Sequence, residues 1–140
     1  RRRHTRYWRD WSSDVCSSDL APHAQTKLVR VLRGKILDVV IDLRDGSPTY
    51  GRSFSDVLSA KNKKQLLIPK GFAHGFAVLS KRADVLYKCD TFYNKGSEKG
   101  IRYDDPILNI DWGISSEEII VSEKDMLLGN LVDTKGDFTF

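Results

Sequence analysis

Cysteine is scarce in this chain of 140 residues, which contains only Cys16 and Cys89. Two cysteines form neither a disulfide framework nor a zinc-ligand pattern, so a reduced, cytoplasmic setting is expected. Long apolar runs are missing as well, because none approaches the roughly 20 residues that span a bilayer. The first residues also lack the apolar stretch of a secretory signal peptide. The sequence therefore argues against a disulfide-stapled secreted domain, and we expect no membrane contact.

The motifs that carry common chemistries are absent too. The chain has no glycine-rich phosphate loop, no serine or cysteine in a nucleophile motif, and no His/Cys cluster with metal-ligand spacing. Its three histidines, His4, His23 and His74, are widely separated. We therefore expect no metal site. Cys89 falls on a strand pattern, and we expect it to serve packing rather than catalysis.

Composition is otherwise ordinary, with 40% hydrophobic and 30% charged residues, and it predicts one globular domain. Residues 1–20, RRRHTRYWRDWSSDVCSSDL, have no apolar periodicity. Back-translation of Arg1–Arg6 and of Asp10–Leu20 matches, in one reading frame, the two fixed parts of a common short-read sequencing adapter. We therefore interpret residues 1–20 as a non-native, disordered segment that precedes a single domain, residues 21–140. Without its five Arg and three Asp, the net charge falls from +4 to +2, and the case for nucleic-acid binding weakens.

Short segments rich in β-branched residues, separated by turn residues, fill the chain after Ala21. Arg33-Gly34 is interpreted as a hairpin turn between the first two segments, and Ser115–Leu128 is compatible with helix. The predicted strands are Lys27–Leu32, Lys35–Leu43, Arg52–Ser59, Gln65–Ile68, Phe72–Leu79 and Ala83–Tyr93. Many short strands with little helix predict a β-sandwich or a barrel.

Alternation within two predicted strands indicates which side chains face a common interior. The odd-numbered residues from Leu37 to Leu43 share one apolar face, and Asp38 lies on the opposite face. Its carboxylate is therefore not simple core filler. The odd-numbered residues from Val85 to Tyr93 form a face that is partly aromatic and able to hydrogen-bond. Such a face suits the interior of a barrel that holds one small ligand.

Five linked phrases stand out after Ala21. They are AQTKLVRVLRGKILDVVIDLRDGSPTYG, LSAKNKKQLLIPKGFAHGFAVLS, VLYKCDTFYN, DDPILNIDW and VSEKD. Together, from about Ala24 to about Leu128, they resemble the dTDP-4-dehydrorhamnose 3,5-epimerase family. The resemblance implies an all-β double-stranded β-helix, that is, a cupin or jelly-roll barrel, with a short helical C-terminal part. It also implies a homodimer that needs neither a metal nor an organic cofactor.

The resemblance further implies inversion at C3 and C5 of dTDP-4-dehydro-6-deoxyglucose to give dTDP-4-dehydrorhamnose, a step of dTDP-rhamnose biosynthesis. Both carbons flank the C4 ketone, so a base can remove each proton if the resulting enolate is stabilised. A cation near the C4 oxygen supplies that stabilisation. An acid on the opposite face must then return the proton, because return from the same face gives no inversion.

Three residues match catalytic positions of the family. Lys27 falls on a substrate-contacting lysine that can stabilise the enolate, with a solvated strand lysine as the alternative. Tyr87 matches the proposed proton donor, with an aromatic side chain lining a core as the alternative. Asp125 matches the carboxylate that orients the catalytic histidine, with a surface cap as the alternative.

Five further residues match positions that bind the substrate. Asp38 matches a carboxylate in the sugar pocket, His74 a ligand-contacting histidine, and Tyr93 an aromatic side chain that stacks on the thymine. Glu98 and Lys124 match positions that contact the nucleotide. A satisfied core histidine is an equal alternative for His74, and an exposed surface charge is the alternative for Glu98 and Lys124.

The general base of the family is a histidine in an RGLHxQ-like phrase shortly before AQxKLVR, and here residues 1–20 occupy that stretch. His23 lies too close to Lys27 to replace this base, and His4 belongs to the segment interpreted as non-native. We therefore expect the chain as given to be inactive and to lack the N-terminal strands of the family, although its parent gene encodes an active enzyme.

Two other functions stay open. An epimerase that inverts a single carbon of a nucleotide sugar would carry the same phrases, because the choice of carbon depends on details of the pocket. A non-enzymatic cupin that binds a sugar nucleotide is the second alternative. The retained Lys27, Tyr87 and Asp125 argue against it, because a binding protein needs neither the acid nor the orienting carboxylate.

Overall fold

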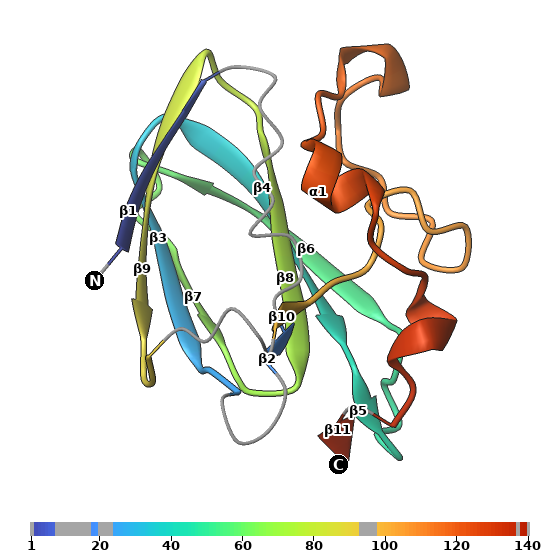
Figure 1. The fold of residues 1–140 in the computed structure, drawn as a ribbon. Helices are drawn as coiled ribbons and strands as arrows, with labels where there is room; N and C mark the ends of the chain where they lie inside the picture. Colours follow the sequence, from blue (N-terminus) through green and yellow to red (C-terminus); the bar gives the residue numbers. More distant parts are fainter. Residues whose placement is uncertain (1, 8–17, 20–23, 93–97, 137, 140) are drawn as a thin grey trace.

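The computed structural model describes residues 2–7, 18–19, 24–92, 98–136 and 138–139, and for residues 2–7, 18–19, 98, 116 and 124 it describes the backbone without the side chain. Two antiparallel sheets face each other (Figure 1). Buried side chains from both sheets pack together in the interior between them. A C-terminal segment covers the outer side of one sheet. This arrangement confirms the predicted all-β barrel with a short helical C-terminal part.

The first sheet has four strands in the order β1-β9-β3-β7, and all neighbours are antiparallel. These strands are β1 (Arg2–Tyr7), β3 (Lys27–Arg33), β7 (Gln65–Ile68) and β9 (Arg82–Cys89). Strand β3 lies in the middle, where Lys27 is opposite both Cys89 and Ile68. Its alternation directs Val29 and Val31 inward, and both valines are fully buried.

The second sheet has three antiparallel strands in the order β6-β4-β8. These strands are β4 (Lys35–Asp42), β6 (Ser53–Ser59) and β8 (Phe72–Val78). The even-numbered residues Ile36 and Val40 of β4 pack in the interior between the sheets. The odd-numbered Val39 and Ile41 pack against the C-terminal segment. Both faces of β4 are therefore covered, which explains its nearly continuous apolar sequence.

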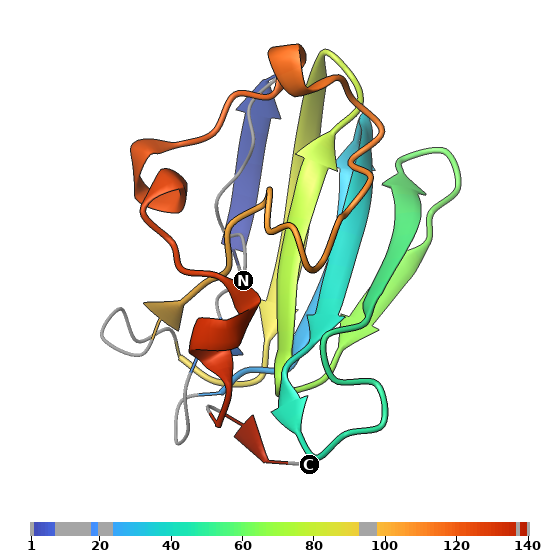
Figure 2. The ribbon, with the colours of Figure 1, turned by 90° about the vertical axis from the view of Figure 1, so that its right-hand side faces the viewer.

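The C-terminal segment runs across the outer side of β4 and β8 (Figure 2). Its apolar anchors include Ile101, Leu108, Trp112 and Leu131, which are all buried. Its short elements are β10 (Glu98–Lys99), the 3-10 helix η2 (Ser116–Glu118), α1 (Glu123–Met126), the 3-10 helix η3 (Leu131–Thr134) and β11 (Phe138–Thr139). Strand β10 pairs with β2 (Ser18–Asp19), and β11 pairs in parallel with β5 (Arg44–Asp45).

The strands β3 and β4 do not form the predicted hairpin, because they belong to different sheets. The single residue between them, Gly34, has a φ of +80°, and a Cβ there would lie 2.1 Å from the carbonyl oxygen of Arg82. Glycine is therefore needed where the chain turns a corner against the start of β9. The hairpin prediction was wrong because a local turn sequence does not specify which sheet the next strand joins.

Residues 2–7 form β1 along the edge of β9, whereas we expected residues 1–20 to lack regular structure. Pairing along a strand edge uses main-chain N–H and C=O groups, so it depends little on the identity of the added side chains. The non-native origin of residues 1–20 stays a prediction. Within the described part of the chain, no helix is long and apolar enough to cross a membrane.

Candidate functional site

Four polar side chains enter the interior between the two sheets. Lys27 and Tyr87 project from the first sheet, and Asp38 and His74 project from the second. Their exposed fractions are 7%, 5%, 0% and 1%, in that order. Side chains of these types are seldom so deeply buried unless they are paired or functional. The structure thus brings together four residues that the sequence had selected on four separate strands.

The registers place these groups toward one end of the barrel. Only Gly34 separates β3 from β4, so Lys27 at the start of β3 and Asp42 at the end of β4 lie at the same end. His74 is opposite Val40, one inward position from that end. The inward residues of the other end are apolar, namely Val31, Ile36, Val78 and Val85. The interior of the barrel is therefore apolar at one end and polar at the other.

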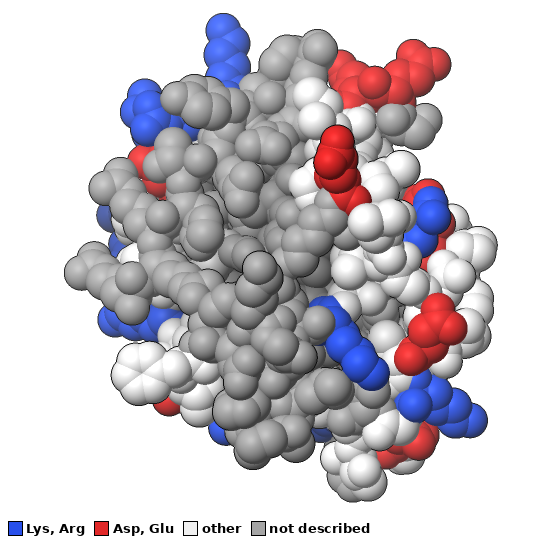
Figure 3. Space-filling view, viewed as in Figure 1, with Lys and Arg blue, Asp and Glu red and all other residues white. Residues whose placement is uncertain are grey.

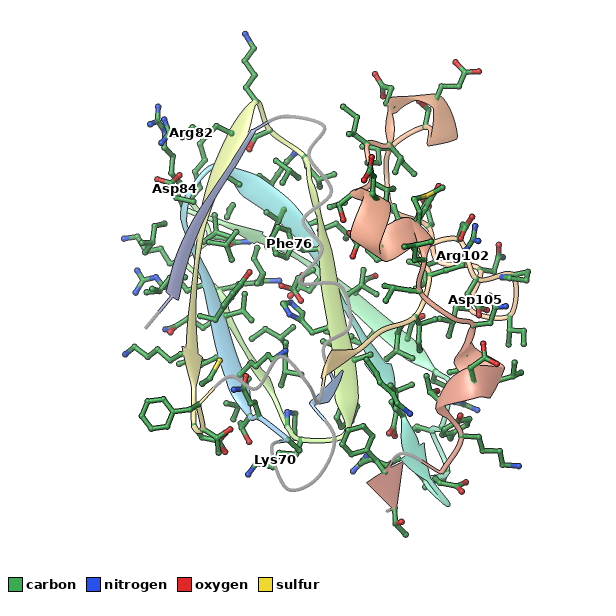
Figure 4. The ribbon with its side chains drawn as sticks, in the orientation of Figure 1. Lys70, Phe76, Arg82, Asp84, Arg102 and Asp105 are labelled. Atoms are coloured by element: carbon green, nitrogen blue, oxygen red, sulfur yellow. The ribbon has the colours of Figure 1, made fainter. Side chains whose placement is uncertain are left out.

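A buried histidine–carboxylate pair and a tyrosine connect the two sheets inside the barrel. His74 Nε2 lies 3.0 Å from Asp38 Oδ2. The His74 ring also meets the Tyr87 ring edge to face, with centroids 6.3 Å apart and an interplanar angle of 85°. Phe76, the next inward residue of β8, lies between the sheets (Figure 4), with its ring centroid 6.2 Å from that of His74.

The second oxygen of Asp38 carries the clearest sign of a binding role. Asp38 Oδ1 is buried and has no hydrogen-bond partner among the described residues. A buried carboxylate oxygen without a partner is costly, so native proteins nearly always satisfy such an atom with protein, water or ligand. Asp38 therefore has an acceptor position left over beside its bond to His74. The alternative of a satisfied core histidine fits His74 itself, whose Nε2 is paired.

Lys27 and Asp125 are both buried, and each must be compared with the alternative that the sequence left open. Lys27 is buried and is therefore no solvated strand lysine. Asp125 is only 2% exposed, and it pairs with Ser122 at the start of α1: its Oδ2 accepts a 2.7 Å hydrogen bond from Ser122 Oγ, and its backbone N donates to that hydroxyl oxygen at 3.3 Å. The capping role expected as the alternative is therefore present, in a buried position. Asp125 belongs to the layer on the outer side of β4, where the neighbouring Val121 packs on the outer core. Asp125 therefore approaches the barrel from a different layer than the four inward residues.

Three predicted binding residues fall partly or wholly outside what the structure describes. Tyr93 lies outside the described residues, and so do the side chains of Glu98 and Lys124. Their backbones belong to β10 and α1. Cys89 is exposed, which contradicts its expected packing role. The buried part of the inward face of β9 ends at Tyr87, two residues before Cys89.

A carboxylate that the sequence analysis did not select lies at the polar end. Asp42 is 2% exposed, and its two oxygens accept hydrogen bonds from Arg44, Ser47 and Thr49. Burial raises the pKa of this carboxyl, but these hydrogen bonds outweigh the burial and hold the pKa far below its usual range. The signal available in the sequence was an aspartate in the even-numbered row of β4 followed closely by two hydroxyl residues.

The Arg44 guanidinium extends this group to the rim of the barrel. It binds Asp42 through Nε at 2.9 Å and NH2 at 2.8 Å, and it lies over the Phe72 ring at 4.6 Å from the centroid. Lys70, two residues before Phe72 in the sequence, lies at the lower end of the barrel in Figure 4. Its Nζ is 3.4 Å from Asp90 Oδ2. On the face seen in Figure 3, acidic and basic side chains are interspersed over the described surface. Among the described residues, no group of three or more His, Cys, Asp or Glu side chains could hold a metal ion.

Comparison with known proteins gives the family. A family model described as dTDP-4-dehydrorhamnose 3,5-epimerase matches residues 18–133. The chain belongs to this family. The match covers every described site residue, from Lys27 in β3 to Asp125 in α1.

Curated relatives carry the same name. A dTDP-4-dehydrorhamnose 3,5-epimerase of Shigella flexneri is 46% identical over 114 residues, which are 81% of this chain and 62% of that protein. One from Pseudomonas aeruginosa is 50% identical over 102 residues, which are 73% of this chain and 56% of that protein. The chain thus spans about six-tenths of the length of these relatives.

Solved structures agree in fold. The crystal structure of a dTDP-4-dehydrorhamnose 3,5-epimerase from Elizabethkingia anophelis has a TM-score of 0.90 at 40% identity, covering 98% of this chain and 73% of that one. A dTDP-6-deoxy-D-glucose-3,5-epimerase from Legionella pneumophila, solved in complex with dTDP-4-keto-L-rhamnose, has a TM-score of 0.86 at 41% identity. It covers 94% of this chain and 68% of that one. The double-stranded β-helix is therefore the fold that this chain shares with its family.

Proposed function

We propose that this chain forms the barrel of an enzyme that epimerises dTDP-4-dehydro-6-deoxyglucose at C3 and C5. The observation that carries the proposal is the set of four buried polar side chains, Lys27, Tyr87, Asp38 and His74, inside one barrel. A cation, a hydroxyl donor and an acceptor in a space with little water are what proton exchange next to a ketone requires. Membership of the epimerase family supports the same reaction.

Lys27 and Tyr87 take the two chemical roles on the first sheet. The ammonium of Lys27 stabilises the enolate oxygen that forms at C4, and its burial strengthens this attraction because few water molecules screen the charge. The Tyr87 hydroxyl returns a proton to the carbon. Lys27 and Tyr87 share the inward face of the β3–β9 pair, at diagonal positions in the register.

The remaining residues bind and orient in this proposal. Asp38 Oδ1 accepts a hydrogen bond from a sugar hydroxyl, and His74 lines the sugar site next to it. Asp125 orients the histidine that acts as base in the family. The nucleotide contacts come from Tyr93, which stacks on the thymine, and from Glu98 and Lys124. No metal or organic cofactor takes part in the proposed reaction.

We further propose that the chain acts in the cytoplasm as a homodimer. The outward face of the first sheet supports a self-association surface, because Leu28 and Leu67 are opposite each other on this face and Leu67 is 63% exposed. Sedimentation velocity over a range of concentrations tests the proposal. A purely monomeric species at every concentration would contradict it.

The decisive experiment is isotope exchange. The full-length gene product is incubated with dTDP-4-dehydro-6-deoxyglucose in deuterated water, and the sugar is followed by NMR. Deuterium at both C3 and C5 is expected. Deuterium at one carbon would favour the single-carbon epimerase, and binding without exchange would favour the non-enzymatic cupin. The 140-residue chain is run in parallel and is expected to bind the nucleotide sugar without exchange, because residues 21–140 contain no match to the base histidine of the family.

A further inference from the structure

We infer that Arg44, fixed by Asp42, positions the Phe72 ring as an aromatic wall against which the sugar ring of the nucleotide-sugar ligand packs. The inference rests on the proposed function and deepens it. It concerns a residue outside the four inward polar groups. Arg44 acts through Phe72 and is therefore a positioning residue, whereas Phe72 is the group that meets the ligand.

The register puts Phe72 at the polar end of the interior. Phe72 is directly opposite Asp42 across the β4–β8 pair, and its side chain packs against the inner core. On β8 it lies two residues before His74, so both side chains project from the same face. A ligand that reaches His74 and Asp38 from this end passes the Phe72 ring. Ligand sites commonly combine such aromatic walls with a few fixed polar groups.

Asp42 supports Arg44 and has no capacity left for a ligand. Asp42 Oδ1 accepts from the Arg44 backbone N at 3.0 Å and from Arg44 Nε at 2.9 Å. Asp42 Oδ2 accepts from Arg44 NH2 at 2.8 Å and from the hydroxyls of Ser47 and Thr49, both at 2.7 Å. A carboxylate offers about four lone-pair positions, and five donors occupy them here. The role of this carboxylate is therefore to hold the guanidinium in one orientation.

The guanidinium in turn holds the ring. Its carbon lies 4.6 Å from the Phe72 centroid, within the range of a cation–π contact. Gly71 makes this approach possible, because a Cβ at that position would lie 2.5 Å from Arg44 Cγ. Arg44 thus covers one face of the ring, and part of the side chain packs against the inner core, which restricts its rotation. Phe72 is only partly buried, so the rest of the ring is open to a ligand. Lysine would keep the charge of Arg44 but lose the planar two-point contact with Asp42.

The test compares two probes, dTDP-D-xylose and dTDP, whose difference is the sugar. In the Arg44→Lys variant, the two-point contact with Asp42 no longer holds the positive charge over the Phe72 ring, so the cation–π contact is lost. Isothermal titration should show dTDP-D-xylose binding weakened about three- to fivefold, the factor for one such contact, and dTDP binding unchanged. Phe72→Leu should weaken dTDP-D-xylose binding at least as much. In the double variant Arg44→Lys/Phe72→Leu, the loss of dTDP-D-xylose affinity should equal that of Phe72→Leu alone, because Arg44 acts on the ligand only through the Phe72 ring.

The matched control is Arg102→Lys. Arg102 makes the same two-point contact with Asp104, at 2.9 Å and 2.8 Å, on the C-terminal segment, and its variant should bind both probes like the wild type. If Arg44→Lys does not fold, Asp42→Asn is the second variant, because it weakens the two bonds that fix the Arg44 guanidinium, and it should show the same selective weakening of dTDP-D-xylose binding. Equal weakening for both probes, no weakening, or additive effects in the double variant would overturn the inference and leave the proposed function standing. A wild-type chain that binds neither probe would instead contradict both.

Discussion

The Tyr87 side chain combines a packing role and a proposed catalytic role, and removal of its hydroxyl oxygen distinguishes the two. Its ring packs in the inner core and meets His74 edge to face, whereas its hydroxyl is the proposed proton donor. Tyr87→Phe keeps the ring contacts, so the free energy of unfolding should change by no more than about 1.5 kcal/mol. Deuterium exchange at C3 and C5 in the full-length enzyme should nevertheless fall by a factor of about 10² to 10⁴.

The control for this variant is Tyr103→Phe, which changes a tyrosine that packs on the outer core. It should leave exchange unaffected. Thermal unfolding of both variants provides the stability comparison. Full exchange activity in Tyr87→Phe would remove Tyr87 from the role of donor.

The pair of Asp38 and His74 allows a stability prediction that does not depend on the reaction. Asp38→Leu leaves a buried imidazole nitrogen without its partner at 3.0 Å, so the free energy of unfolding should fall by about 1–3 kcal/mol. Asp56→Leu is the matched control, because Asp56 is directly opposite Asp38 on β6 and pairs with Lys64 at the surface. Its loss should cost less than about 1 kcal/mol. Urea denaturation measures both, and equal losses would contradict a special role for the buried pair.

At the level of single residues, the family phrases selected four side chains that the structure places inside the barrel, while their roles stay predictions. Lys27, Tyr87, Asp38 and His74 are each buried on inward faces. The sequence could not predict that His74 touches Tyr87, because that contact depends on how two separate sheets face each other. Asp42 was missed for a similar reason, since its donors come from a loop that folds back over the end of β4.

Among the elements, the loop that follows β4 depends on one ionised carboxylate. Hydrogen bonds hold the pKa of Asp42 below its value in the unfolded chain, so the unfolded state takes up the proton first as the pH falls. The stabilisation is therefore complete above about pH 5 and is lost progressively below about pH 4, the ordinary range of an aspartate. Asp42→Asn lacks this titration. Its unfolding free energy should be lower than that of the wild type at pH 7, and the difference should shrink toward pH 3.

Urea denaturation at pH 7, 5, 4 and 3 checks this prediction. Asp104→Asn is the comparison, because Asp104 binds Arg102 at the surface and screening by water reduces its contribution. A constant difference between wild type and Asp42→Asn over the whole range would contradict a coupled titration of Asp42.

The corner between β3 and β4 makes a steric prediction. Gly34→Ala would place a Cβ 2.1 Å from the Arg82 carbonyl oxygen at a φ of +80°, so it should destabilise the fold by well over about 1 kcal/mol. Gly136→Ala provides the control, because Gly136 has a φ of +87° but no heavy atom within 4 Å of the added Cβ. It should cost only the backbone strain of about 1 kcal/mol. Equal melting temperatures for the two variants would show that the close approach at Gly34 is unimportant.

The same corner explains how far strand prediction from sequence could go. The strands that begin at Lys27, Lys35 and Gln65 start where the sequence predicted. The sequence can show this because the residues of a strand face its two sides in turn, which produces a pattern with a period of two. Their partners were not predictable, since β3 pairs with β9, which lies more than 40 residues further along the chain. Partner choice depends on which faces can be buried together in the assembled barrel.

In the molecule as a whole, a second buried carboxylate holds the C-terminal segment together on the outer side of the barrel. Asp105 Oδ1 accepts from the backbone N of Ile107 and Leu108 at 2.8 Å and 3.1 Å, and Asp105 Oδ2 accepts from the backbone N of Leu131 at 2.8 Å. One side chain thus ties two parts of the segment that are more than 20 residues apart. The segment carries Asp125 as well, so its docking affects the proposed orientation of the base histidine.

Asp105→Ala should therefore loosen the outer layer while the barrel stays folded. Two buried N–H groups, those of Leu108 and Leu131, lose their acceptor, and so does the part-buried N–H of Ile107. Local opening of the segment should become easier by about 1–3 kcal/mol for each buried group left unsatisfied. Hydrogen exchange should accelerate at Ile107, Leu108 and Leu131, whereas β3 and β4 keep their protection. Asp104→Ala, the neighbouring exposed acid, should leave exchange unchanged. Uniform acceleration across β3 and β4 would mean that the segment and the barrel unfold as one unit, and that Asp105 stabilises the whole domain rather than the docking of one layer.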